Sequence, residues 1–136
     1  MNPAWALQEA MRAALLAHGP LTALLGGAHI HEETPRGANA SFVSFGDSET
    51  RDWSVMDAKA HEHLITISVA TNSRSRKLAQ QIASEVEAAL DNVGLSLTGH
   101  ALVNLRLASW SVRKEKNGEN YGAALKFRAA TEEETP

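Results

Sequence analysis

The segment HEHLITISVATN, residues 61–72, decides the fold because its apolar and polar residues alternate over the full length of a strand. Ile65, Ile67 and Val69 share one face and the residues between them share the other, since successive side chains of a strand point to opposite sides. An alternation this long predicts a strand with one face turned toward a core.

Two helices are expected, one before and one after this strand in the sequence. The clearer one begins at a serine cap, Ser73 or Ser75, and ends at Gly94. Its apolar residues recur at intervals of four: Leu78, Ile82, Val86 and Leu90. The other spans residues 3–18, where an Asn-Pro pair starts the helix, and LTALLGG, residues 21–27, is expected to add one more short turn.

Further strands are expected before and after the central one. AHIHEE, residues 28–33, and the segment 40–47 precede it, and the polar stretch 47–59 is expected to be a solvated loop. Residues 95–97 and 101–113 follow as strands, the second with Val103, Leu105 and Leu107 pointing inward. The dipeptide Asn117-Gly118 then predicts a hairpin turn into a return strand that starts at residue 121.

The order of these elements predicts an α+β fold, with an antiparallel or mixed β-sheet and two α-helices packed on one face. A chain of 136 residues suits one domain. We expect this domain to occupy residues 1–130 and the acidic segment TEEETP, residues 131–136, to be a disordered tail. The chain has no cysteine, which excludes disulfides, thiol catalysis and cysteine metal sites.

Charge and hydropathy limit the partners that the chain is expected to have. Thirteen basic and sixteen acidic residues give a net charge of −3, and no cluster of Lys and Arg stands out along the sequence. Tight binding of nucleic acid is therefore not expected. No apolar run approaches the roughly 20 residues that a membrane span needs, so no membrane partner is expected.

Two His-x-His pairs raise the possibility of a metal site. His29 with His31, and His61 with His63, each place two imidazoles on one face of a strand, and two adjacent strands could supply the ligands that zinc requires. The alternative is that the histidines belong to the solvated ends of ordinary strands. We favour the second interpretation because no third spaced motif accompanies the pairs, and we expect no cofactor. A small metal-binding protein or hydrolase that uses these four histidines remains the alternative function.

No other catalytic constellation is apparent. No serine lies in a G-x-S-x-G elbow, and the paired carboxylates Glu49 and Asp52 fall in the expected loop. Trp53 stands out because it lies among charged residues with little apolar company. Since Trp and Arg are enriched in interface hot spots, we interpret Arg51, Asp52 and Trp53 as a candidate partner surface, whereas Trp110 is expected to pack in the core.

The succession of these segments resembles a known family. It comprises LTALLGG after the first helix, SFVSFGD, ETRDWS, HEHLITISV, SRSRKLAQQIASEVEAAL, LSLTGHALVNLRL and the final hairpin, over about residues 4–131. In this order they are similar to the tail-completion, or tail terminator, proteins of long-tailed phages and gene transfer agents. No segment is a catalytic signature, so the resemblance rests on order and spacing.

The resemblance implies a structural protein without catalytic activity. Its subunits would form a ring, expected to be a hexamer, that caps the tail tube and contacts both the tube protein and a neck or head-completion protein. DNA would pass through the ring without specific binding. The protein would be assembled in the bacterial cytoplasm and reside in the particle at the head–tail interface. Another neck or tube subunit is the alternative within this class.

The contacts with neighbouring rings or with the channel are expected from three segments. These are the 47–59 loop, the 114–120 hairpin tip with Lys116, Asn117 and Glu119, and the acidic tail.

Overall fold

The computed structural model describes residues 2–32, 41–54, 56, 59–72, 75–114 and 120–133. The described residues form three helices: α1 (Pro3–Ala17), α2 (Gly19–Leu25) and α3 (Arg76–Leu90). They also form six strands: β1 (Ile30–His31), β2 (Phe42–Asp52), β3 (Ala60–Ala70), β4 (Ser96–Leu97), β5 (His100–Lys114) and β6 (Tyr121–Glu133). None of these helices is both long enough and apolar enough to cross a membrane.

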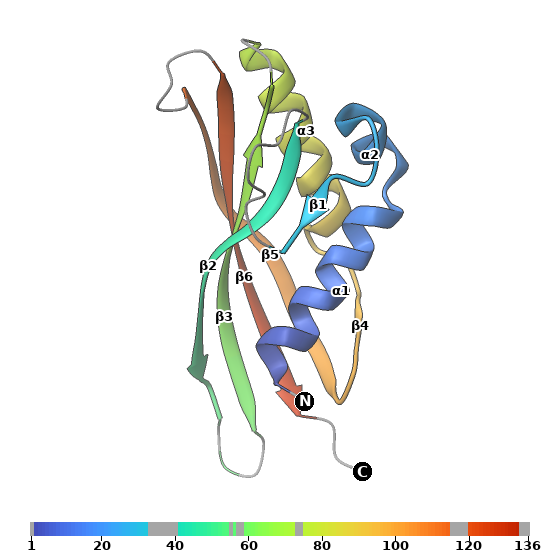
Figure 1. Ribbon diagram of the computed structural model, residues 1–136. Coiled ribbons are helices and arrows are strands. Elements are labelled where there is room, and N and C mark those ends of the chain that lie inside the picture. The colour runs from blue at the N-terminus through green and yellow to red at the C-terminus, as the bar shows by residue number, and fades with distance from the viewer. Residues whose placement is uncertain are drawn as a thin grey trace.

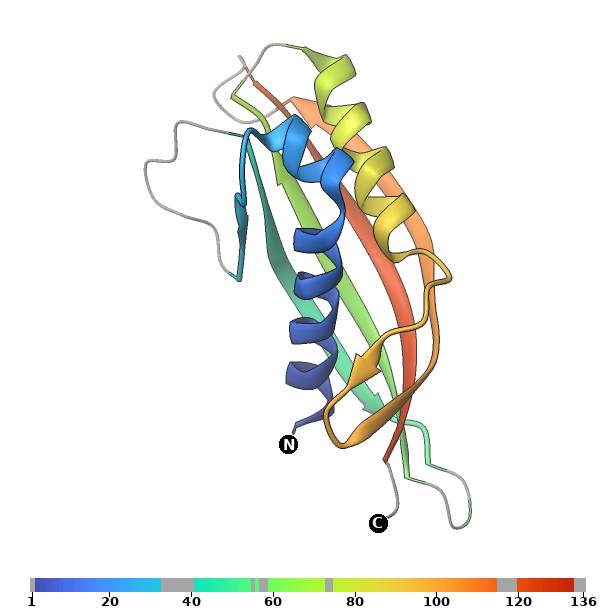
Figure 2. The same ribbon diagram turned by 90° about the vertical axis from the view of Figure 1, so that its right-hand side faces the viewer.

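The strands form one mixed sheet in the order β1-β2-β3-β6-β5-β4. The pair β1–β2 is parallel and the other four pairs are antiparallel. The four long strands twist strongly, and all three helices lie on one side of them (Figures 1 and 2). The α+β prediction is confirmed, with one helix more than expected, because LTALL extends Gly19-Pro20 into the separate helix α2.

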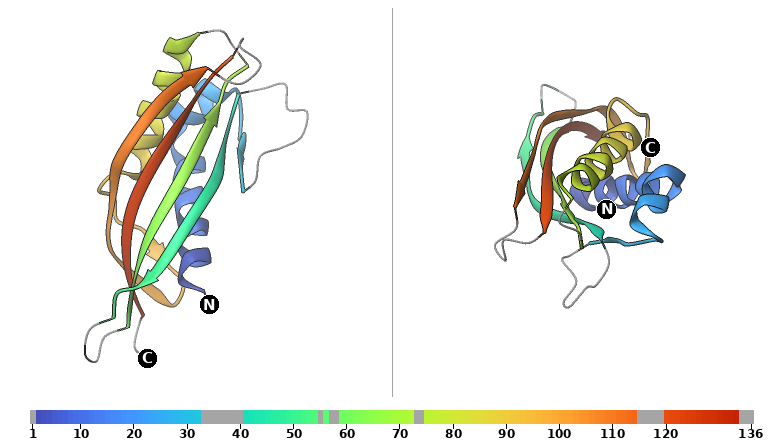
Figure 3. Two further views of the ribbon diagram at one scale, coloured as in Figure 1. Left: turned by 90° about the vertical axis from the view of Figure 1, so that its left-hand side faces the viewer. Right: turned by 90° about the horizontal axis from the view of Figure 1, so that it is seen from above.

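The core lies between the helices and the inner face of the sheet. Periodic apolar residues meet there, as the sequence pattern predicts: Leu7, Met11 and Leu15 of α1, Ile82, Val86 and Leu90 of α3, and Ile67, Leu125 and Phe127 of the sheet are all buried. The opposite, outer face of the sheet carries no helix (Figure 3, left). Within the described residues, the helices therefore cover one face of the sheet and leave the other exposed.

Capping residues and a glycine determine where the helices begin and end. The Asn2 side chain accepts a hydrogen bond from the backbone N–H of Ala4 at 2.8 Å, and Pro3 occupies the first turn. Ser75 caps α3 in the same way, accepting from the N–H of Leu78 at 3.1 Å. Helix α2 ends where Gly26 adopts a φ of 76°, a conformation that side chains with a Cβ disfavour. Helix α3 stops at Leu90, before the expected Gly94.

Two strand predictions are wrong for a common reason, a β-bulge. Strand β2 does not end at Asp47: its register shifts between Phe45 and Ser48 and it continues to Asp52, so half of the expected loop is strand. Val103 does not point inward, because a second shift between Leu102 and Asn104 places its side chain, 46% exposed, outside the core. An extra residue breaks the period of two on which the predictions depend.

The carboxyl end of the chain is more ordered than a tail. Strand β6 runs three residues into the segment expected to be disordered, and Thr131 is fully buried, opposite His61 on β3 and Leu102 on β5. Residues 134–136 lie outside the described part of the chain.

Candidate assembly surfaces

The two His-x-His pairs lie far apart in the structure. His31 of β1 is opposite Ser44, near the start of β2, whereas His61 of β3 is opposite Asp52, at the end of the same strand. Eight residues of β2 separate these two positions, which corresponds to roughly 25 Å at about 3.3 Å per residue. The four histidines therefore do not converge on one ion. Among the described residues, no group of three or more His, Asp or Glu side chains has the arrangement of a metal site.

His63 is a structural residue and does not lie at a solvated strand end, as the sequence had suggested. Its side chain is buried between β2 and β6, with Nδ1 3.0 Å from Thr50 Oγ1 and Nε2 2.9 Å from Thr131 Oγ1. Both ring nitrogens are thus occupied. Burial, with smaller contributions from the charges of His61 and His100, lowers the pKa of His63 from 6.5 to about 4. The neutral imidazole links three strands near their lower ends.

The candidate partner surface at Arg51, Asp52 and Trp53 lies at the lower end of the molecule, where β2 leads toward β3. Trp53 is 51% exposed although its backbone N–H donates to the Ala60 carbonyl at 2.8 Å, and Met56 beyond it is fully exposed. Arg51 Nε lies 3.8 Å from Glu62 Oε1. Hydrogen bonds from Ser54 lower the pKa of the Asp52 carboxyl. An aromatic ring and a methionine are thus presented to solvent at this end, a combination suited to protein contact.

The second predicted surface is only partly visible. Lys116, Asn117 and Glu119 lie outside the described residues. The pairing of Lys114 with Tyr121 brings β5 and β6 together directly before and after them, so these strands form the predicted hairpin.

Sequence reasoning missed a basic surface on the outer face of the sheet, which we call the basic face: Arg106, Lys126 and Arg128. All three side chains are exposed, and Arg106 lies directly opposite Arg128 across β5 and β6. Within the described residues none of the three has a carboxylate within 4.0 Å. Along the sequence Arg106 is 20 positions from Lys126 and 22 from Arg128, and only the pairing register brings it to them.

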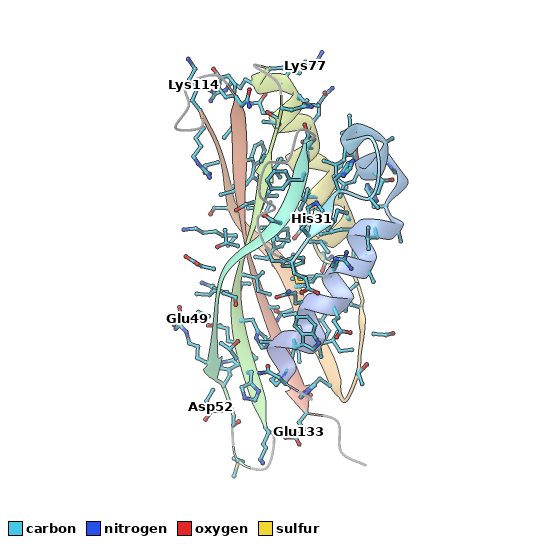
Figure 4. The ribbon with its side chains drawn as sticks, in the orientation of Figure 1. His31, Glu49, Asp52, Lys77, Lys114 and Glu133 are labelled. Atoms are coloured by element: carbon cyan, nitrogen blue, oxygen red, sulfur yellow. The ribbon has the colours of Figure 1, made fainter. Side chains whose placement is uncertain are left out.

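Among the described residues, basic side chains gather at one end of the molecule and carboxylates at the other. At the upper end, the guanidinium of Arg76 and the ammonium of Lys114 lie 5.8 and 5.9 Å from the centre of the Tyr121 ring, with Lys77 nearby (Figure 4). At the lower end, the exposed carboxylates of Glu49, Asp52 and Glu133 gather (Figure 4). Basic residues that are dispersed along the sequence are thus brought together on the surface by the fold.

Trp110 occupies an intermediate position. It faces the helix side of the sheet opposite Leu125, as expected for packing, but remains 36% exposed near the edge formed by β5.

Comparison with known proteins identifies the family of this chain. The family model described as "Tail completion protein gp17" matches residues 9–132. Among solved structures, a chain from the "Virion of native gene transfer agent (GTA) particle" is similar at 31% sequence identity and a TM-score of 0.87, covering 95% of this chain and 96% of that one. No curated protein sequence matches. Since the family match spans nearly the whole fold, the chain belongs to the tail completion protein gp17 family.

Proposed function

We propose that this protein is a structural subunit of a phage-like particle, in which a ring of copies, expected to be a hexamer, caps the tail tube and joins it to the head. The observation that carries the proposal is the match of almost the entire chain, at 31% identity, to a chain of a gene transfer agent virion, together with the family assignment. The protein would act without catalysis, at the head–tail interface, after assembly in the bacterial cytoplasm.

The surfaces of the molecule support an assembly role. One face of the sheet is free of helices, and Trp53 and Met56 are exposed at one end of the molecule. Exposed aromatic and methionine side chains are enriched in protein interfaces, and their exposure in a monomer otherwise favours aggregation. The tail tube protein and a neck or head-completion protein are the partners that such ends would meet.

The hairpin tip is part of this proposal. We propose that Lys116, Asn117 and Glu119 contact a neighbouring ring. Replacing residues 115–120 by a two-residue Asn-Gly turn should preserve folding, because the pairing of Lys114 with Tyr121 already fixes the strands, while joining of tails to heads should fall. Normal joining with the shortened hairpin would remove the tip from the interface.

The channel side of the proposal concerns DNA. A net charge of −3 gives the subunit no general attraction for a polyanion, which suits a ring through which double-stranded DNA passes without specific binding.

Immunogold labelling of purified particles tests the location. Antibody against this protein should label one site per particle, at the junction of head and tail. Labelling along the whole tail would identify a tube subunit instead. Electron microscopy of the purified protein provides a second criterion, because a tube subunit polymerises into long tubes and a terminator should stop at single rings.

A further inference from the structure

We propose that neighbouring subunits contact each other head to tail, with the acidic end of β2 in one copy seated in the basic face of the next. This inference rests on the proposed ring and adds which two surfaces form it. The acidic end is defined as Asp47, Glu49, Asp52 and Trp53, and the basic face is that of Arg106, Lys126 and Arg128.

The basic face contains a hollow suited to an inserted side chain. Asn104, Arg106, Leu107, Ala108 and Arg128 line an open depression of about 340 Å³. It lies beside the bulge between Leu107 and Ser109, where the strand register shifts. Bulges open and re-aim strand surfaces, and they are often found next to functional sites. Two guanidinium groups at this depression offer both charge and stacking to an acidic, aromatic segment.

The pairing of two arginines across β5 and β6 is unfavourable in the isolated subunit. Like charges placed directly opposite each other on adjacent strands are destabilising, and no carboxylate within the described part of the chain pairs with Arg106 or Arg128. A carboxylate brought by a partner would remove this repulsion. The unfavourable pairing in the monomer therefore points to a negatively charged occupant.

The complementary charge is present on the same chain. Three carboxylates, Asp47, Glu49 and Asp52, lie along the exposed half of β2 with a single cation, Arg51. The pairing of Asp52 with His61 puts its side chain on the other face of the strand from Glu49, which pairs with Leu64. Arg51 is itself shared between Glu49 at 3.9 Å and Glu62 at 3.8 Å. Trp53 follows directly, so an acidic segment ends in an exposed ring, which matches a hollow lined by arginine and leucine.

The two surfaces lie on different strands of the same sheet: Glu49 pairs with Leu64, Leu64 with Arg128, and Arg128 with Arg106, so the acidic end and the basic face are different surfaces of one subunit. Strands β2 and β5 are separated by β3 and β6 and border the outer face on its two sides (Figure 3, left). A contact between two different surfaces of identical copies is heterologous and continues from copy to copy until the ring closes. An isologous contact, by contrast, would end at a dimer.

Strands β2 and β5, which border the outer face, also have unpaired backbone groups among the described residues. In the described chain, β1 pairs with β2 only at Val43 and Ser44, and β4 pairs with β5 only at His100 and Ala101. Asp91 and Asn92 bond to β5 as far as Leu107, so the edge from Ala108 onward has no strand beside it among the described residues. Unpaired edges of this kind readily accept a strand from another copy.

Chemical cross-linking in assembled particles tests this contact, and the absence of cysteine from the chain makes the test clean. Particles would be produced with the double variant Glu49→Cys/Arg106→Cys and treated with a short bis-maleimide. We expect a ladder of covalent multimers that ends at the ring size. Each single variant should give no ladder, and neither should the matched control Glu49→Cys/Lys77→Cys, whose second position lies on α3.

A charge exchange gives an independent readout. Arg106→Glu/Arg128→Glu, or Asp47→Lys/Glu49→Lys, should each reduce the yield of joined particles by roughly tenfold or more, and combining all four substitutions should restore most of it. Each variant protein should keep the circular dichroism spectrum of the parent protein, because all four substituted positions are exposed.

The outcomes separate the two proposals. If particles contain the protein at the junction but give no ladder and no recovery on charge exchange, the proposed subunit contact is wrong. The proposal of a ring is unaffected by this result. If the arginine variants release DNA from particles whose rings and ladders are normal, the basic face serves DNA, which also overturns the contact. Particles that form normally without the protein overturn the ring and the contact together.

Discussion

At the residue scale, His63 is the side chain whose role the sequence misrepresents most. The alternation of residues 61–72 correctly places it on the inner face, but the pattern cannot show that Thr50 and Thr131 meet its two nitrogens from strands 13 and 68 residues away. A histidine that looks like a ligand or a wet strand end is instead a buried, neutral link among β2, β3 and β6.

This environment predicts a pH dependence of stability. Because the folded pKa of His63 is about 4 and its unfolded value is 6.5, the unfolded chain binds a proton first as the pH falls. The free energy of unfolding should therefore lose at most about 3 kcal/mol from this group between pH 6.5 and 4. His63→Gln should be less stable at pH 7, and its stability gap to the parent should narrow over that range. Denaturant titration at several pH values measures both.

His61→Gln is the control, because His61 is half-buried on the same strand and makes no hydrogen bond to Thr50 or Thr131. Its pH profile should follow that of the parent closely. A gap between parent and His63→Gln that stays constant from pH 7 to 4 would contradict the assignment.

Trp53 is expected to contribute little to the stability of the fold and much to the joining of tails to heads. Trp53→Ala should change the free energy of unfolding by no more than about 0.5 kcal/mol, because the ring is half exposed. It should reduce the joining of tails to heads by roughly tenfold or more, as the loss of an interface hot spot does. Counting joined particles by electron microscopy gives the readout.

Trp5→Ala provides a comparison of equal chemistry, since Trp5 is 40% exposed in the first turn of α1 and lies outside the β2 segment. Its particles should be joined normally. Equal effects of the two substitutions would argue against a specific role for Trp53.

At the element scale, the helices were the most predictable part of the fold and the bulged strands the least. Apolar residues at intervals of four, with a serine cap, define α3 without any tertiary information. The second half of β2 is invisible to such reasoning, because SETRD is polar on both faces and is recognised only by its pairing with His61–Ile65. For the same reason, the basic face could be predicted residue by residue as outward-pointing but not as a cluster.

The packing of α3 leads to a stability prediction. Ile82 is fully buried between α3 and the sheet, so Ile82→Ala should lower the free energy of unfolding by about 2–5 kcal/mol through lost burial and the cavity left behind. Gln81→Ala, one position along on the exposed side, should change it little. Guanidinium denaturation of both variants checks this, and a comparable loss in both would mean that α3 does not pack as described.

At the scale of the whole molecule, the structure is a sheet with one face packed against a core and the other exposed, which we propose is used for contact. The helices cover the inner face, the outer face carries Arg106, Lys126 and Arg128 with no carboxylate partner in the described part of the chain, and the acidic end of β2 lies across the sheet from them. The α+β class and the family were both accessible from the sequence, because they depend on the order of elements. The charge separation was not, since it arises only when distant strands are aligned.

The proposal that this protein ends the tail and joins it to the head can be tested by electron microscopy of particles made after deletion of its gene. We expect DNA-filled heads accompanied by separate tails, some of abnormal length, with normal particles restored when the gene is supplied in trans. Joined, infectious particles of normal tail length in the deletion strain would contradict it.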